Sequence, residues 1–505
     1  MKMLWLGCLF FIIGLITSKA IISITTVYFI VVLFSFKDYK NFFIAYKRKD
    51  LYPFLCLIGF SFFSLIWSEN LAIGFKELLS QFNFFVIPLL FFCFPSITKK
   101  LLNQILYFFI FLVVIMSFVN MIYFFFFLQE NADIRSLSLF ISHIRFALCI
   151  DIAIFLSCYF LFRKHVSLLL KFILVIIISW LLFYTYFSQV LTGVLCLIGA
   201  LLGAVLYFFF KTKRLNLKVF LLSFLALLMI GISILVFAIN KPERVNINLN
   251  HLPKYTKLGN VYDHYPTRRV YENGYPIYAF LCEKELDSTW KTRSNILLDS
   301  ESISGFRNRD VLVRYLTSKG LSKDAEGINN LTEHDILNIE NGVPSILYLS
   351  NGLMSRYYSL KYELSDKTNP NGHSILQRIE FWRAAIYIIK RNIIYGVGVG
   401  DIDEAFAKAY SSLNSPLLKE NRLGSHNQFF HQVVGYGVIG LSLFLWVLIH
   451  VLRYLFKKNS FILFVIMSIL ITSFLVEDTL GTLTGMSIFS FFYGLSFVEI
   501  KEEII

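Results

Sequence analysis

The sequence predicts an all-α polytopic membrane protein with about twelve transmembrane helices and one large, mainly helical loop between the ninth and tenth spans. The chain of 505 residues is 57% hydrophobic and 17% aromatic, whereas soluble domains are roughly 45–50% apolar. Apolar runs long enough to cross a bilayer as helices recur along it, and the alternating pattern of about ten residues that marks a membrane barrel is missing from the sequence. Charged residues gather between these runs, as expected for loops.

The predicted spans divide the chain into three parts. Residues 1–239 hold spans one to nine, 240–427 form the large loop, and 428–505 hold the last three spans. The first run lacks a small-residue cleavage site, so we interpret it as a span rather than a signal peptide. The spans are expected near 3–17, 20–36, 52–67, 82–95, 102–127, 144–162, 166–187, 190–210, 218–239, 428–454, 460–477 and 482–499.

The distribution of charge orients the spans and argues against a nucleic-acid partner. The net charge is +14, but the excess of lysine and arginine lies mostly in short loops that share one side of the membrane, such as 163–164, 211–218 and 453–458. Cytoplasmic loops carry such an excess. Both termini are therefore predicted to be cytoplasmic, with 240–427 on the opposite, outer side.

Composition gives no sign of a cofactor or a disulfide scaffold. Six of the seven cysteines lie in apolar runs, and Cys282 alone lies in the large loop. No cysteine and histidine spacing matches a zinc site. We therefore expect no metal and no cofactor.

Several polar residues at membrane boundaries fall on the same outer side. Ionisable groups are costly there and are often functional. Their convergence predicts a site at the outer membrane surface, the alternative being that each marks where a helix leaves the lipid. The residues are His143, Arg145, Ser188, Gln189, Arg378, His426, Glu477 and Asp478.

The stretch from Ser374 to Gly440 is the most informative. A helix from Ser374 places Arg378 and Trp382 on one face, and a glycine-rich segment, 396–400, follows it. That segment is either a backbone cradle for an anion, with Gly398 at its centre, or a tight turn between helices. Asp401 with Glu404 predicts a capping box for the next helix.

A second capping box, Ser425 with Gln428, predicts that the tenth span begins here and that His426 lies in its first turn. A neutral imidazole at that point can act as a general base. The alternatives are a capping role for His426, and His431 as the base.

These motifs resemble the O-antigen ligase family, which includes O-antigen polymerases and protein O-oligosaccharyltransferases. The resemblance covers about 378–490. It rests on Gln377-Arg378-Ile379-Glu380-Phe381-Trp382, on Gly396-Val397-Gly398, on Ser425-His426-Asn427-Gln428 before Gly435-Tyr436-Gly437, and on Glu477-Asp478-Thr479-Leu480.

The resemblance implies a glycosyltransferase of the bacterial inner membrane that acts at its periplasmic face in lipopolysaccharide biosynthesis. It implies a donor glycan on undecaprenyl diphosphate, an acceptor hydroxyl on the lipid A core, and a metal-independent, inverting reaction. His426 then corresponds to the base, and Arg378 to an arginine that binds the donor diphosphate. Trp382, Gly398, Asn427, Glu477 and Asp478, with His143 and Gln189, are candidate supporting residues.

The sequence departs from the family pattern at one point. Many members carry an arginine where the eighth span begins, but this chain reads Ser188-Gln189-Val190-Leu191-Thr192-Gly193. Arg145 is our candidate replacement for that second diphosphate contact.

Other functions stay open at this point. A polymerase or a protein glycosyltransferase of the same family differs in its acceptor, and residues 240–373 do not reveal which acceptor is used. A lipid-linked glycan flippase or transporter is the alternative of another class, although transporters usually show internal repeats and charges at mid-membrane.

Overall fold

The computed structural model describes residues 2–35, 48–127, 134–240, 244–245, 247–248, 251–302, 306–350, 352–365 and 370–501. By packing, the chain forms two compact units. The first contains Met1–Leu225, Glu380–Ser415 and Lys419–Ile505, and the second contains Ala226–Ile379 and Pro416–Leu418. This division differs from the predicted one, which followed the expected membrane boundaries at 240 and 427.

Each predicted span coincides with an apolar helix. Among the described residues, seven helices are long and apolar enough to cross a membrane, or eight if the bent pair α5 and α6 is one span. The helices α1, α2, α20 and α21 are shorter, so the count of twelve spans stays a prediction. The apolar helices are α1 (Lys2–Thr17), α2 (Lys19–Ser35), α4 (Tyr52–Phe63), α5 (Leu71–Ser80), α6 (Phe82–Cys93), α7 (Lys99–Phe127), α8 (His143–Leu161), α9 (Leu168–Ser188), α10 (Leu191–Lys211), α11 (Leu215–Asn240), α19 (Gln428–Lys457), α20 (Phe461–Ser473) and α21 (Leu483–Phe497).

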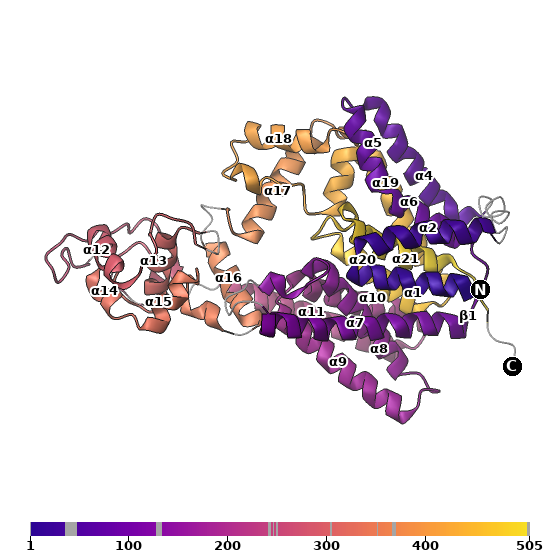
Figure 1. The fold of residues 1–505 in the computed structure, drawn as a ribbon, viewed down its shortest axis with the longest axis horizontal. Coiled ribbons are helices and arrows are strands. Elements are labelled where there is room, and N and C mark those ends of the chain that lie inside the picture. The colour runs from indigo at the N-terminus through magenta and orange to yellow at the C-terminus, as the bar shows by residue number, and fades with distance from the viewer. Residues whose placement is uncertain are drawn as a thin grey trace. The chain divides into compact units, whose positions relative to one another are not determined.

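The core of the first unit is built around α21. Its residues from Thr484 to Phe497 are buried on every face, and it packs against α1, α2, α6, α19 and α20 (Figure 1). Nearby, α10 and α20 approach closely through small residues. A Cβ at Gly199 would lie 2.0 Å from Thr472, and one at Gly203 would lie 2.4 Å from Ser468. Small residues let the backbones of membrane helices pack together in this way.

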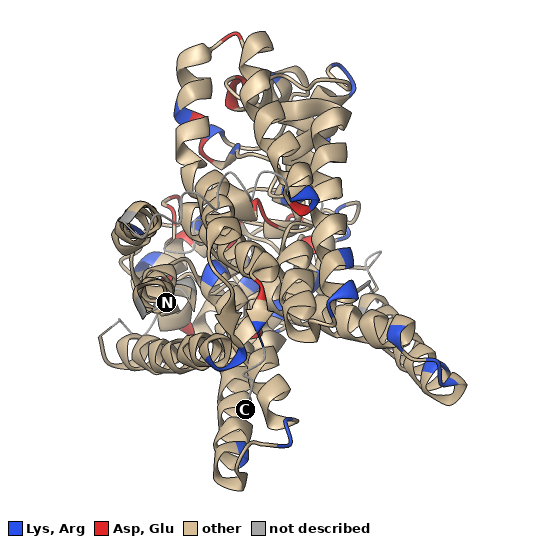
Figure 2. Cartoon of the chain, turned by 90° about the vertical axis from the view of Figure 1, so that its right-hand side faces the viewer, with Lys and Arg blue, Asp and Glu red and all other residues tan. Residues whose placement is uncertain are grey.

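Contacts within the first unit join several of the loops that were predicted to share the cytoplasmic side. Strand β1 (Ile97–Thr98) pairs in parallel with β4 (Ile500–Lys501). The guanidinium of Arg48 donates to the carbonyl of Phe497 at 3.1 Å, and Lys211 donates to Asn459 at 2.5 Å. Figure 2, with both termini toward the viewer, shows lysines and arginines at the ends of protruding helices. These loops therefore contact one another in the structure. Their location on the cytoplasmic side of the membrane stays a prediction.

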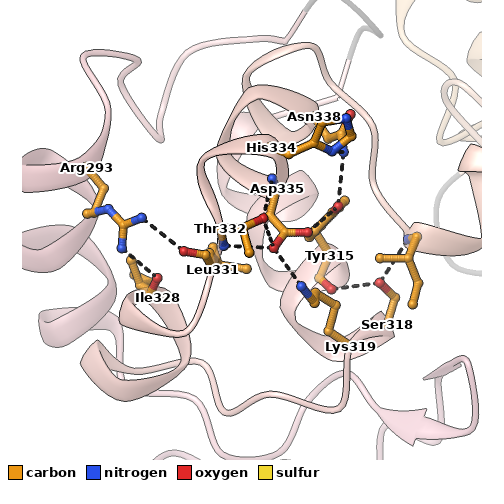
Figure 3. A network of polar contacts seen from close by, with 11 residues as sticks. Arg293, Tyr315, Ser318, Lys319, Ile328, Leu331, Thr332, His334, Asp335 and Asn338 are labelled. Atoms are coloured by element: carbon orange, nitrogen blue, oxygen red, sulfur yellow. Dashed lines mark hydrogen bonds and ion pairs between the residues drawn. The ribbon is translucent and has the colours of Figure 1, made fainter.

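The second unit is a small helical domain with its own core. It contains α12 (Glu283–Arg293), α13 (Asn308–Ser318), α14 (Ala325–Asn329), α15 (Glu333–Glu340) and α16 (Leu353–Ser365), with a hairpin of β2 (Tyr271–Glu272) and β3 (Tyr275–Pro276). Trp290, Leu312, Leu316 and Ile328 are buried together in that core. Arg293 donates to the carbonyls of Ile328 and Leu331, which ties α12 to the turn between α14 and α15 (Figure 3).

Asp335 organises the polar side of this core. Thr332 and Asp335 form a capping box at the start of α15. The carboxylate also accepts from Tyr315 at 2.9 Å and from Lys319 at 2.6 Å (Figure 3). Burial by itself raises the pKa of Asp335, but the hydrogen bonds from Lys319 and Thr332 outweigh it and lower the pKa from 3.8 to about 2.

Replacing Asp335 with Asn is expected to loosen the second unit at neutral pH. Because the pKa is lower in the folded state than in the unfolded chain, the carboxylate stabilises the fold fully above about pH 4. That contribution, about 2 kcal/mol, is lost as the pH falls from about 4 to 2. Hydrogen exchange of α13 and α15, measured on the full chain in detergent and corrected for intrinsic rates, should be faster in the variant at pH 7.

The exposed Asp299, whose side chain is 88% accessible, provides the control. Asp299→Asn should leave the exchange of α13 and α15 unchanged. Equal protection of wild type and Asp335→Asn at pH 7 would contradict the role assigned to the carboxylate.

Candidate active site

His426 lies just before α19 in a left-handed conformation, with φ of 45°. The structure corrects the predicted capping box here: Asn427, not Ser425, caps the helix, and its side chain accepts the N–H groups of Phe429 and Phe430 at 3.0 Å each. His426 therefore precedes the helix instead of lying in its first turn. Histidine is one of the residue types that tolerate a positive φ.

The short connection between α20 and α21 holds His426 through two carboxylates. Asp478 accepts the backbone N–H of His426 at 3.0 Å and the hydroxyl of Ser425 at 3.2 Å. The ring Nδ1 of His426 lies 3.4 Å from a carboxylate oxygen of Glu477. When the Glu477 carboxylate is ionised it can only accept, and Nδ1 is then the donor in this contact. The lone pair of the imidazole is then on Nε2, where it can accept a proton.

Burial differs across this pair in a way that suits a general base. The side chain of Glu477 is 4% exposed, whereas that of His426 is 33% exposed. The carboxylate is thus shielded from water, and the imidazole can still be reached. A general base requires this combination of a neighbour that orients the ring and a ring that remains accessible.

Helix α17 (Ser374–Ile389) supplies the residues that pack on the imidazole of His426 and on the backbone beside it. The ring of Phe381 stacks on His426 with centroids 5.3 Å apart and planes 25° apart. The indole N–H of Trp382 donates to the carbonyl of Ser425 at 3.1 Å. Trp382 thus fixes the backbone beside the histidine.

Arg145 approaches the same connection from α8. It is 5% exposed, and it donates to the hydroxyl of Thr482 at 3.1 Å and to the carbonyl of Asp478 at 3.3 Å. Its remaining nitrogen, Nη1, is buried without a hydrogen-bond partner in the described part of the chain. Arg145 therefore supports Asp478, which in turn holds His426, and it keeps one donor unused.

Three other residues that the sequence predicted for the site lie in or next to α8, α9 and α17. His143 is the first residue of α8, two positions before Arg145. Gln189 ends α9 with φ of 56°. Arg378 lies one turn before Trp382 on α17, in the part of that helix that belongs to the second unit.

The glycine-rich segment after α17 is a tight turn. Gly396 and Gly398 have φ of 72° and 93°, a conformation that glycine adopts at little cost. The N–H groups of Val397 and Gly398 donate to carbonyls of α19, at 2.9 and 3.0 Å, and that of Gly400 donates to the hydroxyl of Ser68 at 3.1 Å. Because these donors are used in packing, the segment anchors α17 to α19 and is not a cradle for an anion.

Asp401, at the start of α18 (Ile402–Ser412), behaves differently from the prediction. It makes no capping bond to its own helix. Its carboxylate instead accepts the backbone N–H groups of Glu69 and Asn70, at 2.7 and 3.0 Å. Asp401 thus ties α18 to the segment between α4 and α5, more than 300 positions away, which local sequence reasoning missed.

The comparison with known families coincides with this region. Residues 342–445 match the family model described as O-antigen ligase. The match includes α17, the glycine turn, α18 and His426, while Arg145, Glu477 and Asp478 lie outside it. A search of curated proteins finds no match.

The apolar helices indicate a multi-pass membrane protein, and the matched domain supports a glycan transferase, because members of that family are glycosyltransferase-like enzymes. The match supports an assignment to the O-antigen ligase family. Members of this class act on a lipid-linked glycan donor and a glycan acceptor in a membrane.

Proposed function

We propose that the protein is an O-antigen ligase that moves a polysaccharide from undecaprenyl diphosphate to a sugar hydroxyl of the lipid A core. The proposal places the reaction at the periplasmic face of the inner membrane, without a metal and with inversion at the anomeric carbon. The observation that carries it is the geometry of His426, whose Nδ1 faces the buried Glu477 and whose Nε2 is left to accept a proton. The family match over the same stretch supports it.

In the proposed reaction, the acceptor oxygen attacks the anomeric carbon of the donor. The bond from that carbon to the diphosphate oxygen breaks, and its electron pair stays with the diphosphate. Nε2 of His426 takes the proton of the acceptor hydroxyl, and Arg378 stabilises the negative charge that develops on the leaving group. Because attack comes from the face opposite the leaving group, the configuration inverts.

Transfer by the purified full chain in detergent tests the proposal. The substrates are lipid-diphosphate-linked glycan and lipid A core, with and without EDTA, for wild type and His426→Ala. We expect transfer that survives EDTA and is lost in the variant. Folded wild type that transfers nothing to the core would contradict the ligase proposal.

The acceptor distinguishes the ligase from its relatives in a deletion strain. If the deletion strain loses its surface polysaccharide but still contains lipid-linked polymer, the result supports the ligase proposal. Accumulated single repeat units indicate a polymerase, and unglycosylated periplasmic proteins indicate a protein glycosyltransferase. Intact glycan trapped on the cytoplasmic side indicates a flippase.

Arg145→Ala is expected to abolish transfer at an unchanged protein level. The substitution removes the hydrogen bonds to Thr482 and to the carbonyl of Asp478, so the support under His426 is lost. It also removes Nη1, the donor that we propose for the diphosphate. Arg163→Ala, just beyond the other end of α8, is the matched control and should retain activity. Full transfer by Arg145→Ala would rule out both roles.

A further inference from the structure

A cavity of about 740 Å³ lies within the first unit. It is an open cavity lined by the end of α17, the turn at Gly396, helix α18 and the residues that follow α4. We name it the α17–α18 pocket and define it by Trp67, Tyr387, Arg391, Tyr395, Asp401 and Lys408. His426, Glu477, Asp478 and Arg145 are not among its lining residues, and its volume is in the range of ligand sites, about 300–1,000 Å³.

Aromatic side chains form much of its wall. The rings of Trp67 and Tyr395 are 5.7 Å apart, and Tyr395 is 53% exposed. The Nε1–H of Trp67 is buried and has no hydrogen-bond partner among the described residues. A buried donor left unpaired is destabilising. A ligand hydroxyl would satisfy it, and the flat rings would cover an apolar face of the same ligand.

The charges of the pocket argue against a phosphate ligand. Glu69, Asp401 and Glu404 contribute carboxylates, against the cations of Arg391 and Lys408. Lys408 is paired with Glu404 at 2.7 Å, and the Arg391 guanidinium lies over the ring of Tyr387 at 3.6 Å. The wall is therefore not net positive, and it offers carboxylate, guanidinium and amide groups next to aromatic faces. A neutral polyhydroxylated ligand fits this chemistry better than a diphosphate does.

Helix α17 relates the pocket to His426. Phe381 stacks on His426, and Tyr387 lines the pocket. At 1.5 Å per residue, the two lie about 9 Å apart along the helix. This separation corresponds to a short run of sugar rings rather than to one.

We propose that the α17–α18 pocket binds sugar residues of a glycan substrate, away from the bond that reacts. The inference rests on the proposed function. The ligand is a neutral carbohydrate segment, which belongs either to the donor glycan or to the acceptor core. Binding there sets the affinity for the glycan and leaves the chemical step at His426 unchanged.

Calorimetric titration of the full chain in detergent tests the pocket directly. The probes are the donor glycan released from its lipid by mild acid and, separately, core oligosaccharide freed of lipid A. Wild type should bind one of them, and which one identifies the source. Tyr395→Ala and Trp67→Phe, which removes the indole N–H and part of the ring surface, should each raise Kd at least tenfold. Tyr186→Ala, a similarly exposed tyrosine on α9, should leave it unchanged.

Steady-state transfer separates failure of the pocket from failure of the proposed function. Both variants should raise KM for the substrate that carries the bound sugar and keep kcat within twofold. Active wild type with an unchanged KM and Kd in both variants overturns the pocket and leaves the ligase proposal standing. Wild type that binds glycan but transfers it to no acceptor overturns the ligase proposal alone. Wild type that binds neither probe overturns the pocket.

Discussion

His426→Asn is expected to reduce transfer by about 10²–10⁴-fold, the range that a positioned general base contributes. Asparagine is the suitable replacement because it tolerates the positive φ of this position, so the backbone N–H can still donate to Asp478. What the variant loses is the ring nitrogen that takes the proton of the acceptor hydroxyl. The measurement is kcat for transfer by purified protein under saturating donor and acceptor.

His431 provides the matched control for this experiment. It lies on α19, where its N–H donates to the carbonyl of Asn427, and it was the competing candidate for the base. His431→Asn should keep kcat near that of wild type. If His431→Asn is inactive and His426→Asn is active, the assignment of the base is reversed.

Arg378→Ala is expected to lower kcat/KM for the lipid-linked donor by about 10²–10³-fold, comparable to losing one preorganised donor that stabilises developing charge. A guanidinium binds phosphate through two parallel hydrogen bonds, which an ammonium cannot reproduce. Arg378→Lys should therefore recover only part of the activity. Initial rates over a range of donor concentrations give the comparison.

Arg383 on the same helix separates the role of Arg378 from a general effect of charge. Its side chain is 53% exposed and contacts Glu380 at 3.3 Å. Arg383→Ala should transfer at close to the wild-type rate. Equal losses in Arg378→Ala and Arg383→Ala would indicate a nonspecific effect on α17 and would remove Arg378 from the donor site.

The apolar runs predicted the helices well because hydropathy is a property of each run itself. The capping boxes show where such local reasoning ends. Thr332 and Asp335 form theirs, but the carboxylate of Asp401 binds the N–H groups of Glu69 and Asn70, and Ser425 binds Asp478. For Asp401 the competing partners are distant in the sequence. For Ser425 the hydroxyl contacts both the distant Asp478, at 3.2 Å, and the carbonyl of Asn427 two residues away, at 2.8 Å.

The same limit applies to the site. Counting spans predicted that four residues share one side of the membrane: His426, Arg145, Glu477 and Asp478. It could not predict the hydrogen bonds between them. His426 and Glu477 are separated by 51 positions, and no spacing rule relates them. The α17–α18 pocket had no signal at all in the sequence, because Trp67 and Tyr395 come from segments that only folding brings together.

The burial of α21 has a consequence for biogenesis. This helix is enclosed on every face, yet the ribosome makes it after all the other described helices. The helices that surround it must therefore enter the membrane with its place filled by lipid or by one another. The connection that carries Glu477 and Asp478 lies just before α21 in the chain. We therefore expect the contacts of this connection with His426 and Arg145 to form only after α21 has been made, later than the packing of the earlier helices.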